Sequence, residues 1–237
     1  MSNTFAIAWK EIRTYFSSPM AYIIASVFLA ITGYLFVRSV STPFPEASVR
    51  GWMTDSLFLF VLWSPVLTMR LLAEEQKLGT LELLMTSPVR DLEIILGKYL
   101  ATVVIFLVTL SLTLFYIIFL FFYGNPDFGP LFTAYLGLIL YGASTMAIGL
   151  LASSLTNNQI VAAVIGFGVL LLLTLLEQAS EVTSGQTAQF LAQISLTGHF
   201  RGFARGVIDT GSLVYYLSTI VMFLFLAFRN LESKRWR

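Results

Sequence analysis

The distribution of charge along the chain restricts its fold more than any other feature. No Asp, Glu, Lys or Arg occurs in residues 99–126 or 128–176, and the second run is about twice as long as one membrane crossing. Charged residues make up 11% of the chain, less than half of the roughly 25% found in soluble domains. Because a charge in hydrocarbon costs several kcal/mol, the pattern predicts an all-α, polytopic integral membrane protein.

Six apolar segments are long enough, or nearly so, to cross a membrane. The second is short and extends into its charged flanks, Pro65 is expected to kink it, and residues 153–159 separate the fourth from the fifth. A loop is expected over residues 39–55. The predicted spans are Pro19–Val37, Ser56–Met69, Tyr99–Tyr123, Leu131–Ala152, Ile160–Leu176 and Ser212–Phe228.

The first 18 residues form the pattern of an amphipathic helix. Apolar residues recur at helical spacing from Phe5 to Phe16, with polar residues between them. Such a helix lies in the membrane interface and does not resemble a cleavable signal peptide. It serves either as a simple anchor or as a contact for a partner protein. The candidate residues of this interface helix are Trp9, Lys10, Glu11 and Arg13.

The stretch from Arg70 to Lys98 contains nine charged residues between apolar runs and is therefore expected to lie in water. Gly79 is suited to end one helix, Thr80 to cap a second, and Ser87-Pro88 to begin a third. A short helix over Thr80–Met85, with apolar residues at Leu81, Leu83 and Leu84, could dock on a soluble partner. The alternative is an ordinary loop lying on lipid headgroups.

Residues 177–211 form the second polar region and are expected to be a loop. Phe190, Leu191, Phe200 and Phe203 within it predict short helices that dip into the outer leaflet and pack against the spans. The charged members of this region are interpreted as local ion pairs and helix caps rather than substrate ligands. They are His199, Arg201, Arg205 and Asp209.

The basic residues predict the orientation of the chain. Six spans place both ends on one side, and that side carries ten of the 14 Lys and Arg residues when the Arg70–Lys98 stretch is included. Positive charge is retained in the cytoplasm, so both termini and this stretch are expected there, with residues 177–211 outside. No internal repeat is visible, and residues 1–237 are interpreted as a single domain.

Several chemistries are absent from the sequence. Cysteine does not occur and histidine occurs once, which excludes disulfides and His-based metal clusters. The chain has no G-x-x-x-x-G-K-[ST] phosphate-binding loop, and a net charge of +1 gives no sign of nucleic-acid binding. Any ATP-driven work therefore needs a partner chain, and this chain itself is not expected to be an enzyme.

Three motifs together resemble the ABC-2 type transporter permeases. They are WKEIRTYFSSPMAYI, EEQKLGTLELLMTSPVRDLEIILGKYLA and HFRGFARGVIDTGSLVYY, and they occur in this order on the faces deduced above. Within the family, the sequence is most similar to the branch of the gliding-motility permease and the permease for copper-site maturation of nitrous oxide reductase. The resemblance covers nearly the whole chain.

The resemblance implies a permease subunit in the plasma membrane that dimerises, as a homo- or heterodimer, and binds two ATP-binding subunits. ATP and Mg would be held by those subunits, membrane lipids would surround the chain, and an accessory or substrate-binding protein could join. Export is the implied direction. Thr80–Met85 would be the coupling helix, and the residues matching the family's loop pattern are Glu74, Glu75, Gly79, Thr80, Glu82 and Pro88.

Two other classes of function stay open on the sequence. One is a membrane scaffold that binds an ATPase without moving a substrate. The other is a membrane-embedded enzyme that uses His199 with Asp209 or a serine, although no nucleophile occurs at a motif spacing.

Overall fold

The described part of the chain consists of helices joined by turns and short connections. The computed structural model describes residues 3–41, 50–86, 89–124 and 126–235, and within them it contains helices and turns but no strand. The helices are α1 (Asn3–Phe16), α2 (Pro19–Val40), α3 (Arg50–Thr68), α4 (Ala73–Leu78), α5 (Thr80–Thr86), α6 (Asp91–Leu112), α7 (Leu114–Tyr123), α8 (Phe128–Leu155), α9 (Gln159–Val182), α10 (Gln186–Ile194), α11 (Phe200–Ala204) and α12 (Thr210–Arg235).

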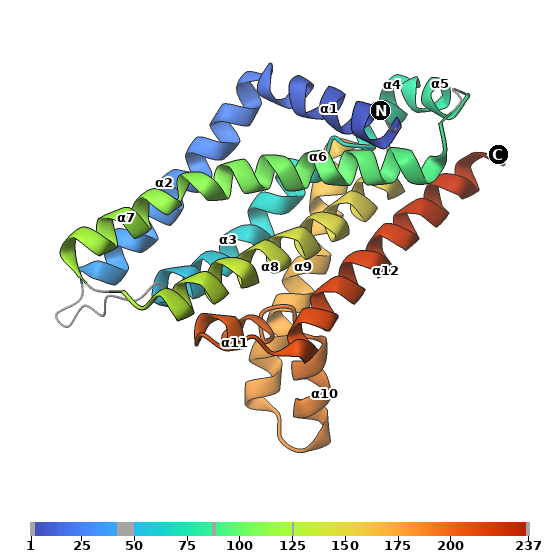
Figure 1. Cartoon of the computed structure of the whole chain (residues 1–237). Coiled ribbons are helices and arrows are strands. Elements are labelled where there is room, and N and C mark those ends of the chain that lie inside the picture. The colour runs from blue at the N-terminus through green and yellow to red at the C-terminus, as the bar shows by residue number, and fades with distance from the viewer. Residues whose placement is uncertain (1–2, 42–49, 87–88, 125, 236–237) are drawn as a thin grey trace.

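Six segments of the described chain are long and apolar enough to cross a membrane, which confirms the predicted fold class. They are Pro19–Val40, Gly51–Leu78, Asp91–Phe122, Phe128–Leu155, Gln159–Val182 and Thr210–Lys234. Helix α8 is the most buried of them and contacts α3, α6, α9, α11 and α12 (Figure 1). The outer helices expose apolar residues such as Ile23, Phe122 and Val221, as helices facing lipid do.

Glycines on α8 allow its neighbours to approach closely. A Cβ on Gly142 would collide with the ring of Phe106 on α6, and one on Gly149 would collide with Thr68 on α3. A Cβ on Gly137 would lie 2.7 Å from Phe203 on α11. Helix α8, at the centre of the bundle, therefore packs closely against α3, α6 and α11 at three glycines, where no side chain holds the helices apart.

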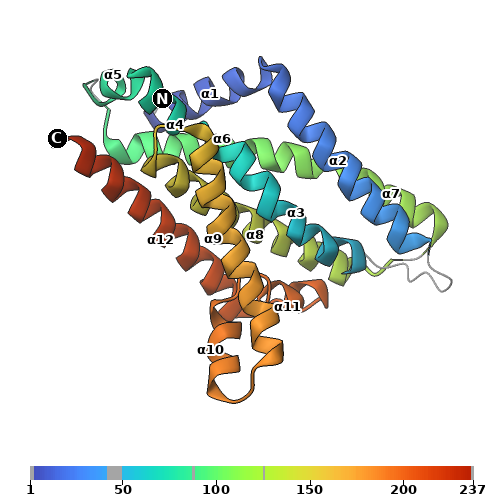
Figure 2. The same cartoon turned by 180° about the vertical axis from the view of Figure 1, so that it is seen from behind.

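The ends of the bundle differ in composition. Helices α1, α4 and α5 lie together with both chain ends at one end, which we call the elbow end (Figure 1). Helix α10 folds back beside the last turns of α9 at the opposite end, the hairpin end, with α11 close by (Figure 2). Both chain ends and the charged stretch therefore share one end of the bundle, as an even number of spans predicts.

Several helices are longer than predicted, because charged residues cap or pair at their ends. Helix α3 begins at Arg50, inside the segment predicted as a loop, and α6 begins at Asp91, where Glu93 accepts a hydrogen bond from the Arg90 backbone amide. Helix α9 continues to Val182, so Glu177 lies on a helix rather than in a loop. Helix α12 runs to Arg235, beyond the predicted end of the last span at Phe228. Ser87 and Pro88 lie outside the described residues.

The hairpin end contains the two short helices that the apolar residues predicted. Phe200 and Phe203 are fully buried, as expected, but Phe190 is exposed and Leu191 is only partly buried. The prediction for Phe190 was wrong because α10 packs mainly on the end of α9, which extends beyond the central helices.

Candidate functional site

Helices α4 and α5 form a sharp corner at the elbow end, and we call residues 73–86 the elbow. Gly79 adopts a left-handed conformation with φ 71° and ends α4, as its position predicted. Its amide donates a hydrogen bond to the carbonyl of Gln76. Thr80 begins α5, but its hydroxyl donates to the carbonyl of Glu75 over 3.4 Å instead of capping the new helix. The predicted helix is present, while the predicted cap is not.

A serine of α8 fixes the start of the elbow to the central helix. The buried Ser153 hydroxyl accepts hydrogen bonds from the amides of Leu72 and Ala73 at 3.0 and 3.1 Å. It donates in turn to the carbonyl of Met69 at 2.9 Å. The backbone where α3 ends and α4 begins is therefore satisfied by a single side chain from the last turn of α8.

The next residue, Ser154, joins the elbow to the far end of α12. Its carbonyl accepts hydrogen bonds from Gln76, Asn230 and Lys234 at 3.1, 2.7 and 2.7 Å. The Lys234 ammonium also donates to the Gln76 side chain at 2.7 Å. The last carbonyls of a helix carry partial negative charge and have no partner within the helix, so an amide and an ammonium are suitable ligands for them.

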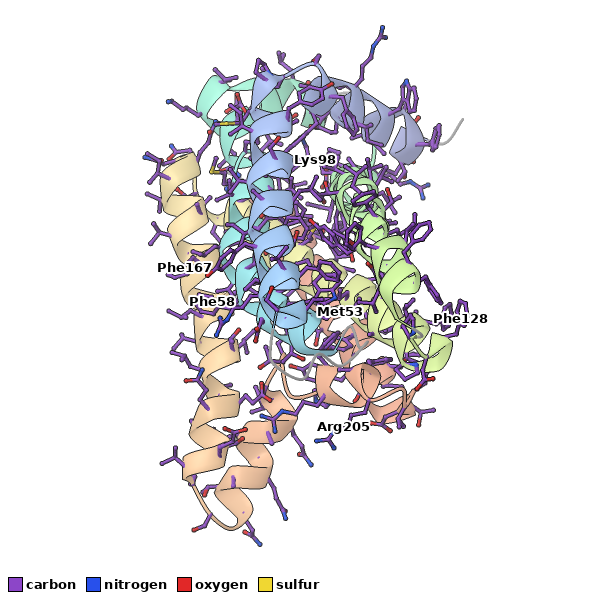
Figure 3. The ribbon with its side chains drawn as sticks, turned by 90° about the vertical axis from the view of Figure 1, so that its left-hand side faces the viewer. Met53, Phe58, Lys98, Phe128, Phe167 and Arg205 are labelled. Carbon is purple, nitrogen blue, oxygen red and sulfur yellow. The ribbon has the colours of Figure 1, made fainter. Side chains whose placement is uncertain are left out.

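The opposite side of the elbow is held by an ion cluster, Lys98–Glu75–Glu11. Lys98 on α6 is 1% exposed, and its Nζ lies 2.8 Å from a Glu11 oxygen on α1 and 2.9 Å from a Glu75 oxygen on α4. Lys10 approaches the same Glu75 oxygen only to 3.9 Å and is largely exposed. Figure 3 labels Lys98 near the elbow end of the bundle, remote from Arg205 at the hairpin end.

Helix α1 lies along the first turns of α6 and completes the elbow end. The Asn3 amide donates to Glu93 at 3.2 Å, and Gly97 faces Ile7 so closely that a side chain would not fit. The Arg70 guanidinium stacks 4.0 Å above the ring of Tyr15, and burial raises the pKa of Tyr15 to about 12. Tyr15 is therefore neutral at physiological pH and holds α1 against the end of α3.

The predicted interface residues face different environments. Trp9 and Phe5 are exposed on α1, on a side that the bundle leaves uncovered, and Arg13 is exposed beside them. Glu11 instead points to Lys98 and is 17% exposed. One face of α1 thus fits a membrane surface and the other belongs to the ion cluster.

The apolar surface of the elbow differs from the predicted one. Leu83 is 71% exposed, but Leu81 is 5% exposed and packs in the core, and Leu84 is partly buried. Leu81 therefore packs α5 against the bundle and cannot contact a partner in this arrangement. Its burial corrects its expected role as an anchor for that partner. Leu78, which the sequence reasoning did not single out, is 66% exposed at the corner. Glu82 is exposed and Glu74 is half-buried, whereas Glu75 belongs to the ion cluster.

The polar residues of the hairpin end contact one another. Arg201 pairs with Glu177 at 2.6 Å and with Glu181, and the Glu181 carboxylate raises the pKa of Arg201. His199 lies 3.1 Å from Ser212 and stacks on Tyr215. A cavity of about 360 Å³ lies beside these side chains. Arg205 is exposed.

Asp209 caps α12. Its carboxylate accepts hydrogen bonds from the amides of Gly211 and Ser212 and from the Ser212 hydroxyl, which lowers the pKa of Asp209. Ser212, where the last predicted span begins, lies inside the helix.

The sequence reasoning missed the residues that hold the elbow in place. The sequence pattern places Ser153 and Ser154 in a break between spans, Asn230 and Lys234 beyond the last predicted span, and Lys98 at the end of a polar stretch. The sequence contains one signal for the burial of Lys98, which is a lone cation directly before a long charge-free run.

The chain matches a known protein family over more than half of its length. The profile of the ABC-2 family transporter proteins matches residues 44–196, from before α3 through α10. The chain belongs to the ABC-2 transporter family. It is therefore a multi-pass membrane protein of this transporter family.

Individual relatives are more distant. The chain is 32% identical over 117 residues to the probable multidrug ABC transporter permease YbhR of Escherichia coli K12, and the same values hold for YbhR of Escherichia coli O157:H7. The match covers 48% of this chain and 31% of YbhR.

Proposed function

We propose that this ABC-2 permease couples ATP hydrolysis by two separate ATP-binding subunits to export of a substrate across the plasma membrane. The observation that carries the proposal is the elbow. It presents exposed leucines and is joined to four helices of the bundle by hydrogen bonds and ion pairs. ATP and Mg belong to the partner subunits, since the sequence contains no phosphate-binding loop of its own.

The elbow has the properties that a docking element needs. Leu78 and Leu83 are exposed on both sides of Gly79, at the end of the bundle rather than on its lipid-facing sides. Exposed large apolar side chains beyond the membrane-spanning surface favour a protein partner. Glu82 and Glu74 lie beside them and can pair with basic residues on that partner, although exposed ion pairs add only about 0–1 kcal/mol each.

The contacts that hold the elbow can transmit force from a bound subunit to the membrane-spanning helices. Ser153 and Ser154 join the elbow to α8 and α12, and Lys98 joins it to α1 and α6. A subunit bound to the leucines therefore acts on four helices of the bundle. A solvated loop lying on headgroups would not need these buried contacts.

The orientation follows from the basic residues. The elbow end includes Lys10 and Arg13 on α1, Lys77 on α4 and Arg229 near the end of α12, whereas Arg201 at the hairpin end is paired with Glu177 and Glu181. This distribution favours a cytoplasmic elbow with both chain ends beside it, and an external hairpin. The exposed Trp9 and Phe5 would then lie in the inner membrane interface as an interface helix.

The cargo and the assembly follow from the same features. Residues 128–176, which include the central helix α8, contain no charged residue, so a charged and hydrated cargo is disfavoured. A second permease copy or a related chain completes a transport path between two bundles. The three sequence motifs favour the gliding-motility and nitrous-oxide-reductase maturation branch of the family.

Co-purification tests the docking surface. The double variant Leu78→Ala/Leu83→Ala should bind the co-expressed ATP-binding subunit at least about tenfold more weakly, because each buried leucine contributes roughly 1.5–3 kcal/mol. The matched control is Leu172→Ala/Leu217→Ala, which removes two exposed leucines from spans. Glu82→Gln should have a smaller effect than the elbow double variant. Equal recovery of the ATP-binding subunit with both double variants would refute the docking assignment.

A further inference from the structure

We propose that Lys98 is a positioning residue for the transport cycle, because it ties the elbow to α1 and α6 so that both helices follow when the elbow moves. The inference rests on the proposed function, in which an ATP-binding subunit displaces the elbow. Lys98 is not among the residues matched to the family's loop pattern, and it does not belong to the docking surface.

Burial makes Lys98 unlike the other cations of the chain. Among the Lys and Arg residues whose side chains are described, Lys98 alone is buried. A buried ammonium needs carboxylates close to it, since removing it from water without a partner is strongly unfavourable. Both of its carboxylates come from other elements, Glu11 from α1 and Glu75 from α4. Three elements therefore meet at one nitrogen atom.

The contact on the elbow side is narrow. Lys98 holds Glu75 through one carboxylate oxygen, and the other oxygen is buried without a hydrogen-bond partner in the described part of the chain. Lys10 is too distant and too exposed to replace Lys98. If the elbow shifts by more than a fraction of the Lys98–Glu75 distance, Lys98 must move with it. Otherwise this ion pair breaks at a site where little water can replace it.

The two helices attached to Lys98 lead into the membrane. Helix α1 continues through a tight turn at Ser17 and Ser18 into α2, whose first turn Ser18 caps. Helix α6 continues almost directly into α7. The opposite side of the elbow is attached through Ser153 and Ser154 to α8 and α12 without a carboxylate–cation pair. Helices α1 and α6 are therefore joined to the elbow by the ion pairs of Lys98, whereas α8 and α12 are joined to it by hydrogen bonds to uncharged acceptors.

Distance measurements between spin labels test this role, and the cysteine-free chain allows specific labelling. The complex with its co-purified ATP-binding subunit carries one label at exposed Ser184, in the turn between α9 and α10 at the hairpin end, and a second at Lys77 or at Trp9. The first pair reports movement of the elbow and the second movement of α1. In the otherwise unmodified complex, ATP with vanadate should shift both distances.

In Lys98→Met, the elbow distance should still shift while the α1 distance no longer responds, and Lys98→Arg should restore the α1 response. Because Lys98→Met leaves two carboxylates unpaired, the neutral variant Lys98→Met/Glu11→Gln/Glu75→Gln keeps the experiment valid if the single variant does not fold. Its α1 response should be lost as well. Lys10→Met, which removes an exposed ammonium close by, should respond like the unmodified complex.

The proposal fails if the α1 distance shifts normally in either Lys98→Met variant. It also fails if, in the unmodified complex, ATP with vanadate changes the elbow distance but not the α1 distance. Both results would leave the proposed function intact. Absence of any ATP-binding subunit from the purified unmodified complex would instead overturn the proposed function itself, and the inference with it.

Discussion

The single hydrogen that Gly97 carries in place of a side chain determines how closely α1 can lie on α6. A Cβ at this position would be 2.8 Å from Ile7 and 2.9 Å from the carbonyl oxygen of Thr4. A carbonyl cannot move without its helix, so even a methyl group would push α1 outward. Glu11, on the same helix, would be drawn away from Lys98.

Gly97→Ala is therefore expected to destabilise the protein by about 1–3 kcal/mol, as overpacking does elsewhere. Gly168→Ala is the matched control, because it places a methyl group on a membrane helix where nothing lies within 4 Å. The control should be neutral or stabilising by about 0.5–1 kcal/mol through helix propensity. Thermal unfolding of the purified variants in detergent measures both, and equal shifts would contradict the close approach of α1.

Lys98 shows where residue-level prediction from the sequence stops. Local pattern places it at the end of a polar stretch, and its solvation is the simplest expectation. Its partner Glu11 lies 87 residues earlier in the chain, so no local pattern contains the pair. Gly79, by contrast, was predictable, because a left-handed helix end depends only on its own backbone and its neighbours.

At the level of elements, the start of α12 depends on Asp209. Its pKa is lowered from the ordinary value of 3.8, and the first cause is the hydrogen bond from Ser212. A carboxyl group whose folded pKa is depressed stabilises the fold above its unfolded pKa, and this contribution is lost as the pH falls through the folded pKa.

Asp209→Ala should therefore lower the unfolding temperature at neutral pH. The difference from the unmodified protein should shrink as the pH is lowered below 3.8. A difference that stays constant across this range would show that the carboxylate charge does not support the cap. Thermal unfolding at a series of pH values measures it.

The sequence predicted the existence of the helices better than their ends. The apolar runs locate all six spans, since hydrocarbon excludes charge over a fixed thickness. The predicted spans stop before charged residues, yet Glu93, Glu177 and Lys234 lie on helices that continue past the apolar run. These side chains cap, pair or bind a helix terminus, which makes a longer helix compatible with their charge.

For the whole molecule, the orientation in the membrane is the main expectation. Cysteine introduced at Ser184, in the turn between α9 and α10, should react with an impermeant maleimide from outside the cell. Cysteine at Thr80, on the elbow, should react only after the membrane is opened. Both positions are exposed and the chain has no cysteine of its own. Labelling of Ser184→Cys from the cytoplasmic side alone would reverse the proposed topology.

The central place of α8 could not be read from the sequence. Small residues along this helix predict close packing, but they do not identify the neighbours. The choice of Phe106, Thr68 and Phe203 as contacts depends on how distant helices are ordered around α8. The same limit explains why Ser153 and Ser154 were interpreted as a break, since their partners come from α3, α4 and α12.

The order of the three clustered charges along the chain has a consequence for biosynthesis. Glu11 and Glu75 both precede Lys98, so the ribosome has produced each acidic partner before the basic residue emerges. The translocon then receives the third span with its ammonium already able to find a counter-charge, which reduces the cost of releasing that span sideways into lipid.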